Sequence, residues 1–139
     1  MQQPDPFHYP APNEITAPKY AAIRAAADAA AYELAALICV DPRTGKWAWW
    51  EEHAGHDNKP VAHESINRVT KALYDAIQEH APPGADRSAA ERCCRIARMA
   101  ANEVIAADLT PESIPERLLF ENLYLARWQA CAAIALGSV

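Results

Sequence analysis

Residues 65–108 read SINRVTKALYDAIQEHAPPGADRSAAERCCRIARMAANEVIAAD, and this stretch decides the fold. Apolar residues recur at helical spacing on both sides of its APPGAD segment. The Pro-Pro-Gly sequence at 82–84 ends one helix, and either Asp86 or Ser88 can cap the next. The stretch therefore predicts a helical hairpin at the core of the protein, with helices over about 64–80 and about 87–107.

A stripe of apolar residues predicts another helix before this hairpin, over about 19–38. Thr16 is its expected cap, with Pro18 in the first turn. A last helix is expected over about 116–136, capped by Thr110 before Pro111 or by Ser113 before Pro115.

The composition points to a single all-α domain. The chain has 139 residues, of which 51% are hydrophobic, and many of these are alanine, the best helix former. It has only four glycines, and runs of β-branched residues are absent. We therefore predict a four-helix bundle over residues 19–139, built on the hairpin at 65–108 and preceded by a proline-rich arm at 1–18.

Charge, cysteines and hydropathy exclude several function classes. A net charge of −5 argues against a general nucleic-acid coat, because binding to a phosphate backbone needs a basic surface. The four cysteines form no C-x-x-C pair, and their small apolar neighbours are typical of buried, reduced thiols. No signal peptide is visible, and no apolar run approaches the roughly 20 residues that span a bilayer. We expect a cytoplasmic protein that does not enter a membrane.

The arm at 1–18 contains five prolines and cannot be helical. It is either a disordered tail, the favoured interpretation, or an extended arm that lays Phe7 or Tyr9 on a neighbouring surface.

The longest connection, 41–63, contains three of the four tryptophans. Long connections in compact domains are usually functional or folded onto the core. The tryptophans either cover the end of the bundle, which is favoured for Trp49, or form a stacking wall for a flat ligand such as a nucleobase, which stays open for Trp47 and Trp50.

Three histidines, His53, His56 and His63, also lie in this connection beside several carboxylates. Such residues invite a metal hypothesis. A solvated polar loop is the favoured interpretation, because no second motif with ligand spacing accompanies them, and we predict no metal site.

A weak internal repeat relates the helix at 87–107 to the helix at 116–136. Ile96-Ala97-Arg98-Met99 aligns with Leu125-Ala126-Arg127-Trp128, and the alignment continues through Ala101 with Ala130 and Ile105-Ala106 with Ile134-Ala135. The first two helices match more loosely, with Ala30, Tyr32 and Glu33 against Ala72, Tyr74 and Asp75. The pattern favours a duplicated hairpin slightly over chance similarity between alanine-rich helices.

The start of the helix at 87–107 is the best chemical feature. Gly84-Ala85-Asp86-Arg87-Ser88 would present backbone N–H groups, a hydroxyl and a guanidinium, which together suit a phosphate. Ordinary capping explains the same residues and is favoured when they are taken alone. No nucleophile, metal or phosphate-loop motif of an enzyme is present, so we expect no catalysis.

Residues 65–107 resemble the helical hairpin of phage anti-CBASS and anti-Thoeris sponge proteins. The resemblance is carried by Gly84-Ala85-Asp86-Arg87-Ser88-Ala89-Ala90, Ala97, Met99, Ala101-Asn102 and Ile105-Ala106. It implies a small α-helical homo-oligomer that binds cyclic nucleotides or cyclic ADP-ribose-like signals at subunit interfaces without cleaving them. Arg87, Ser88 and Asn102 are the positions that match. The chain departs from this family in its first helix, its tryptophan-containing connection and its last helix.

The first hypothesis is therefore immune evasion by signal sequestration in the cytoplasm of an infected bacterium. Arg87, Ser88, Lys71, Arg98 and Arg127 would hold phosphates, and Trp47, Trp50, Tyr74 or Tyr9 would stack on bases. The alternative is a small structural or protein-binding phage accessory module without a small-molecule ligand.

Overall fold

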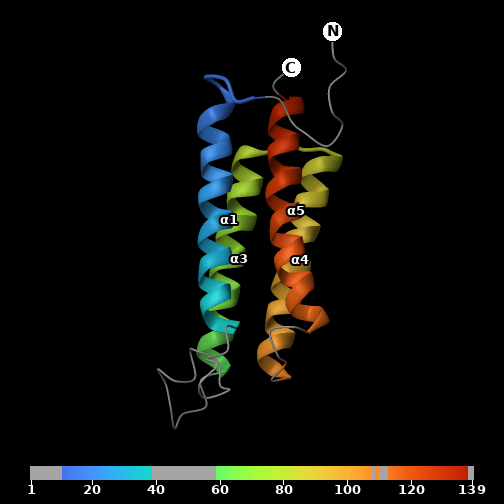
Figure 1. Ribbon diagram of the computed structural model, residues 1–139. Helices are drawn as coiled ribbons and strands as arrows, with labels where there is room; N and C mark the ends of the chain where they lie inside the picture. Colours follow the sequence, from blue (N-terminus) through green and yellow to red (C-terminus); the bar gives the residue numbers. More distant parts are fainter. Residues whose placement is uncertain (1–10, 39–58, 108, 110–112, 138–139) are drawn as a thin grey trace.

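The computed structural model describes residues 11–38, 59–107, 109 and 113–137. These residues form α1 (Thr16–Ile38), α3 (Lys59–His80), α4 (Ala85–Ala106) and α5 (Ile114–Gly137), and they contain no strand. The helices run alternately up and down, so that each is antiparallel to the next (Figure 1). The predicted all-α four-helix bundle is confirmed. Residues 1–10 of the predicted arm at 1–18, and the connection at 39–58, lie outside the described residues. The prediction that the arm is not helical was wrong for residues 16–18, which form the first turn of α1 with Pro18 in it.

Neighbouring helices pack in the cyclic order α1, α3, α4, α5, and α5 closes the ring against α1. The most extensive contact joins α4 to α5, while α1 and α4 barely touch across the diagonal. The seam between α3 and α4 therefore lies on the opposite side of the bundle from the seam between α1 and α5. A duplicated hairpin predicts this order, but so does any antiparallel four-helix bundle.

The start of α1 corrects one predicted cap. The side-chain Oδ1 of Asn13 accepts hydrogen bonds from the N–H groups of Ile15 and Thr16, both at 2.9 Å. The Thr16 hydroxyl accepts a bond from the Asn13 N–H in return, also at 2.9 Å. Asn13 is therefore the cap and Thr16 its reciprocal partner three residues later, as in a capping box. The prediction of Thr16 as the cap was wrong.

The other helix starts follow simple rules. At α5, Ser113 accepts a bond from the Glu116 N–H at 3.3 Å, so the predicted Ser113 cap is confirmed. At α4, the cap is Gly84, whose φ of 154° is a backbone conformation that favours glycine, and no side chain caps the helix. The prediction that Asp86 or Ser88 caps α4 was wrong.

The helix α3 begins at Lys59, five residues before its predicted start at 64. Pro60 is tolerated there because the first N–H groups of a helix have no partner within it. The early start takes His63, which the sequence placed in a loop, into the helix.

The core is apolar and made largely of small side chains. Alanines that face it on α4 and α5 are almost fully buried, among them Ala90, Ala97, Ala101, Ala126 and Ala130. Small side chains let helix backbones approach closely, which fits the extensive contact between these two helices.

Burial supports one half of the proposed repeat and not the other. The aligned pairs Ala97 with Ala126 and Ala101 with Ala130 are all 0% exposed. By contrast, Ala30 is 0% exposed whereas its partner Ala72 in α3 is exposed. Aligned residues of α4 and α5 therefore face the core in the same way, whereas aligned residues of α1 and α3 do not. Duplication stays a prediction.

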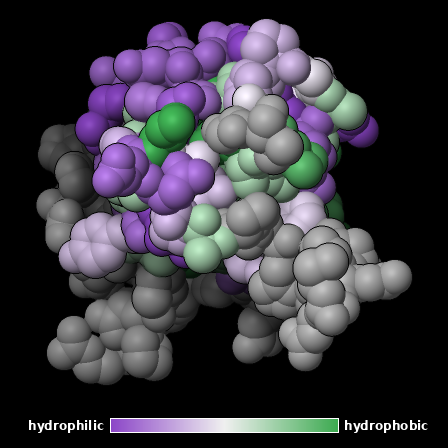
Figure 2. All heavy atoms as spheres, turned by 90° about the horizontal axis from the view of Figure 1, so that it is seen from above, coloured by the Kyte–Doolittle hydropathy of each residue, from purple (hydrophilic) through white to green (hydrophobic). Residues whose placement is uncertain are grey.

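The end of α5 lies against the turn between α3 and α4. A Cβ added at Gly137 would lie only 2.3 Å from the Cγ of Pro82, so glycine is required for this close approach. Figure 2 views the bundle from this end, and hydrophilic side chains cover most of the described surface that is visible there, with small hydrophobic groups among them. No helix among the described residues is both long and apolar enough to cross a bilayer.

Candidate functional site

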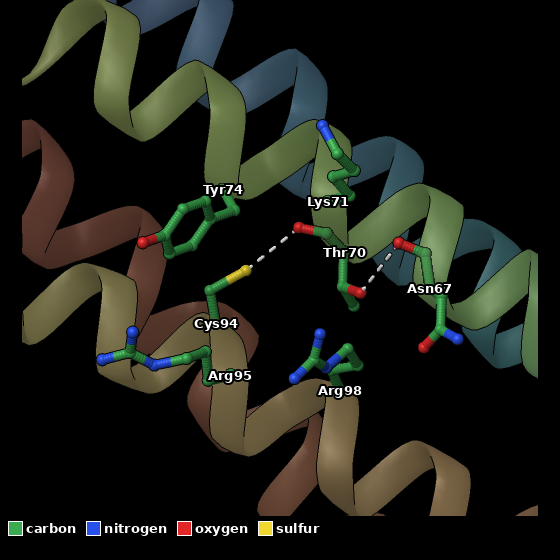
Figure 3. A pocket seen from close by; sticks show the side chains of 7 residues that line it. All are labelled: Asn67, Thr70, Lys71, Tyr74, Cys94, Arg95 and Arg98. Atoms are coloured by element: carbon green, nitrogen blue, oxygen red, sulfur yellow. Dashed lines mark hydrogen bonds between the residues drawn. The ribbon is translucent and has the colours of Figure 1, made fainter.

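A groove lies in the seam between α3 and α4, with a cavity volume of about 350 Å³ (Figure 3). We call it the α3/α4 groove. It is lined by Asn67, Thr70, Lys71, Tyr74, Cys94, Arg95 and Arg98. This volume lies at the small end of the range of about 300–1,000 Å³ that is usual for small-molecule sites.

Helical spacing brings these seven residues together. On α3, residues 67, 70, 71 and 74 recur every three or four positions, and on α4 residues 94, 95 and 98 do the same. Residues at these intervals share one face of a helix. The two faces meet along the antiparallel hairpin, just outside the apolar core.

The floor of the groove is formed by Thr70 and Cys94. The Thr70 hydroxyl donates to the carbonyl oxygen of Ile66 at 2.7 Å, and the Cys94 thiol donates to the carbonyl oxygen of Thr70 at 3.2 Å. Burial raises the pKa of the Cys94 thiol to about 11, although the nearby Arg98 works in the opposite direction. This thiol stays protonated at neutral pH, and a protonated thiol is a poor nucleophile.

The walls of the groove carry three cationic side chains. Lys71 forms an ion pair with Asp75 at 2.7 Å on the exposed rim. Arg95 and Arg98, in contrast, form no ion pair with any described residue. The guanidinium of Arg98 points into the space between the two helices, and Arg95 lies one turn before it on α4 (Figure 3). The groove thus offers two guanidinium groups that no described carboxylate pairs with, in a protein whose net charge is −5.

One end of the groove is closed by hydrogen bonds around Glu91. The Tyr74 hydroxyl donates to Oε2 of Glu91 at 3.4 Å, and Nε of Arg87 donates to Oε1 of Glu91 at 2.8 Å. Nη1 of Arg87 also donates to the carbonyl oxygen of Ala81 at 3.4 Å. This network joins the start of α4 to the end of α3.

The other end is closed by a chain of amide hydrogen bonds. Nδ2 of Asn102 donates to Oδ1 of Asn67 at 3.2 Å, and Oδ1 of Asn102 lies 2.6 Å from Nδ1 of His63. In this arrangement the His63 Nδ1 carries the proton, because an amide oxygen can only accept. Lys59 follows one turn further on and donates to the carbonyl oxygen of Ala106 at 3.3 Å.

The structure brings together some of the predicted site residues. Lys71, Tyr74 and Arg98 line the α3/α4 groove, and Arg87 and Asn102 flank it through the bonds just described. Whether any of them touches a ligand stays a prediction.

Other predicted site residues lie elsewhere. Ser88 is exposed at the start of α4, and Arg127 lies in the opposite seam, where it pairs with Asp28 of α1 at 3.3 Å. Tyr9, Trp47 and Trp50 lie outside the described residues.

The predicted phosphate cradle at the start of α4 borders a shallow hollow of about 230 Å³ beside the end of α5. Its lining comes mostly from the 82–87 turn and from Ala133, Leu136 and Gly137. The guanidinium of Arg87 is engaged with Glu91 and Ala81, so this hollow offers less positive charge than the α3/α4 groove.

Four residues of the groove were missed by the sequence reasoning: Asn67, Thr70, Cys94 and Arg95. Thr70 was assigned to the apolar stripe of its helix, and Cys94 was interpreted only as one of the buried, reduced thiols. Arg95 carried a usable signal, because it lies three residues before Arg98 and so on the same face of α4.

The described residues contain no group of three side chains suited to a metal ion. Of the three histidines considered for a metal, only His63 is described, and it is bonded to Asn102. His53 and His56 lie outside the described residues.

No family, curated protein or solved structure matches this chain.

Proposed function

We propose that this protein binds a cyclic nucleotide or cyclic ADP-ribose-like signal in the α3/α4 groove and sequesters it without cleaving it. The observation that carries the proposal is the pair of guanidinium groups of Arg95 and Arg98, which have no ion-pair partner in the described part of the chain. Both arginines are exposed, and an exposed guanidinium without a carboxylate partner can donate paired hydrogen bonds to the phosphate oxygens of a ligand from solution.

The chemistry of the lining supports a phosphate-bearing ligand. Arginine offers planar donor groups that match phosphate oxygens in pairs, and two arginines three residues apart can hold one phosphate or two adjacent ones. Tyr74 is half-buried beside them and supplies an aromatic face of the kind that stacks on bases.

The floor supports binding rather than turnover. Among the described residues, the only thiol that lines the groove is that of Cys94, and its raised pKa of about 11 keeps it protonated. Retention of an intact signal is also what the resemblance of the hairpin to phage sponge proteins implies. The same resemblance implies a homo-oligomer in the cytoplasm of an infected bacterium, and a second copy would then cover the open side of the groove.

Calorimetry against cyclic dinucleotides, cyclic trinucleotides and cyclic ADP-ribose isomers tests the proposal. We expect saturable binding of at least one, together with recovery of the unchanged compound by chromatography. Arg98→Met should remove this binding, whereas Arg127→Met, which changes the aligned arginine in the opposite seam, should leave it intact. Absence of heat and of thermal stabilisation with every compound would overturn the proposal.

A second candidate is a protein-binding module, and exposed aromatic residues favour it. Tyr32 on α1 is 82% exposed and Tyr124 on α5 is 64% exposed. The ion pair of Asp28 with Arg127 sets the register of these antiparallel helices, so both tyrosines lie about one turn from it, on the same side. Exposed apolar groups near one another often mark protein contacts. This candidate predicts that Tyr32→Ala abolishes partner capture while Arg98→Met is silent.

A further inference from the structure

We infer that Arg87 is a positioning residue of the α3/α4 groove: it holds the carboxylate of Glu91 away from Arg95 and so keeps Arg95 available to an anionic ligand. The inference rests on the function proposed above for this groove. It gives Arg87 a different task from direct contact with a phosphate.

Glu91 lies between two arginines on the same face of α4. Arg87 precedes it by four residues and Arg95 follows it by four, so its carboxylate can reach either guanidinium. An acidic residue placed four positions before a basic one is the more favourable order on a helix. Spacing alone would therefore pair Glu91 with Arg95, yet the structure pairs it with Arg87 at 2.8 Å.

Contacts outside α4 explain the choice. Tyr74 of α3 donates its hydroxyl to the second carboxylate oxygen of Glu91. Arg87 is itself fixed by the carbonyl oxygen of Ala81, at the end of α3. The side chains of Arg87 and Glu91 are only 23% and 17% exposed, so water screens this pair less than it screens the other ion pairs of the bundle.

The arrangement decides the charge of the groove. With Glu91 held by Arg87, the described residues place no carboxylate against Arg95. If Arg87 were removed, Glu91 could turn toward Arg95, neutralise it and bring a negative charge to the edge of the groove. Both effects would weaken the binding of an anion.

A ligand-free measurement tests the first half of the inference. NMR relaxation of the side-chain Nε–Hε group of Arg95 reports whether its guanidinium is restrained. We expect a mobile group in the wild type, a restrained one in Arg87→Met, and a mobile one again in Arg87→Met with Glu91→Gln. No change in Arg87→Met would overturn the inference.

Binding of inorganic pyrophosphate and of cyclic di-AMP to the same four proteins, including Glu91→Gln alone, tests the second half. Arg87→Met should weaken binding about tenfold, which corresponds to the loss of one charge-assisted hydrogen bond. In the Glu91→Gln background the same change should alter affinity less than about twofold, because there is then no carboxylate to restrain. Arg87→Lys should retain most of the affinity, since lysine can also pair with Glu91.

The possible failures are distinguishable. An equal loss from Arg87→Met in both backgrounds would show that Arg87 touches the ligand directly, which overturns the inference and leaves the proposed function standing. If neither probe and none of the cyclic dinucleotides, cyclic trinucleotides and cyclic ADP-ribose isomers binds the wild type, or if Arg95→Met and Arg98→Met leave binding unchanged, the proposed function of the groove and this inference are both overturned.

Discussion

The α3/α4 seam and the α1/α5 seam lie on opposite sides of the bundle and carry aligned arginines in different states. Arg127 of α5 pairs across its seam with Asp28 of α1. Arg98 of α4, the aligned residue, has no ion-pair partner in the described chain and points into a cavity. Both directly follow an alanine that is 0% exposed, so both lie at the same angle from the core face of their helix.

The comparison distinguishes an arginine that is paired within the bundle from an arginine that is available to bind a ligand. An exposed ion pair such as that of Arg127 satisfies both partners and contributes little beyond local stability. Arg98 and Arg95 lie beside the α3/α4 groove, and no carboxylate in the described part of the chain pairs with either of them. The neighbourhood of an arginine, and not its place in a helix pattern, decides which of the two roles it takes.

The largest expected effect concerns the buried alanines that precede the two aligned arginines. Ala97→Leu and Ala126→Leu should each lower the free energy of unfolding by up to about 3 kcal/mol, because each overfills a position without free space. Urea unfolding measures the change. The matched control, Ala72→Leu on the exposed side of α3, should stay within about 0.5 kcal/mol of the wild type. Markedly unequal losses of stability from Ala97→Leu and Ala126→Leu would show that the aligned positions of α4 and α5 are not equally packed.

The next effect concerns the floor of the α3/α4 groove. Burial raises the pKa of the Cys94 thiol from its ordinary value of 9.0 to about 11, so between these two pH values the folded state keeps the proton that the unfolded state loses. The stability that this thiol contributes is therefore complete below pH 9 and is lost as the pH rises towards 11. We expect a loss of about 2 kcal/mol by pH 10.5 that is absent in Cys94→Ala. Parallel pH profiles for the two proteins would contradict it.

A smaller effect is expected at the end of the groove. Asn102→Leu removes the hydrogen bonds of Asn102 with His63 and Asn67 and should cost about 1–2 kcal/mol of unfolding free energy. Asn67→Ala breaks only one of these bonds and should cost less. Chemical denaturation gives both values, and the prediction is wrong if Asn67→Ala is the more damaging change.

The smallest expected effect concerns the stability contributions of Arg98 and Arg127. Arg127→Met should reduce the unfolding free energy by about 0.2–1 kcal/mol through loss of its pair with Asp28, whose side chain is 69% exposed. Arg98→Met should leave stability unchanged or raise it slightly, because it relieves repulsion with Arg95. Thermal unfolding at low salt, where exposed charges are least screened, measures the stability change of each variant. A larger loss from Arg98→Met would mean that its charge supports the fold.

The sequence predicts the bundle well because the signals that specify it are local. The apolar stripes gave the four helices, and the Pro-Pro-Gly sequence at 82–84 gave the hairpin turn. The errors fell at helix starts. Asn13 and Thr16 are both residue types that cap helices, so only the hydrogen bonds of Asn13 distinguish them. The first turn of α3 contains Pro60, and it precedes the apolar stripe that locates the helix.

The groove was predicted only in part, because ion pairing depends on contacts between helices. Lys71, Tyr74 and Arg98 were proposed as ligand-binding residues and do line one cavity. Nothing in the sequence showed that Glu91 pairs with Arg87 rather than with Arg95, since that choice depends on Tyr74 and on the end of α3. For the same reason Arg127 was indistinguishable from Arg98 before the structure paired it with Asp28.

All seven residues of the α3/α4 groove come from one hairpin and fall within a span of 32 positions, from Asn67 to Arg98. The shape of the α3/α4 groove therefore depends on the register of two consecutive helices, which the short turn at 82–84 fixes. A protein engineer could copy these side chains onto another antiparallel helix pair of the same register and so transfer the groove to a different scaffold.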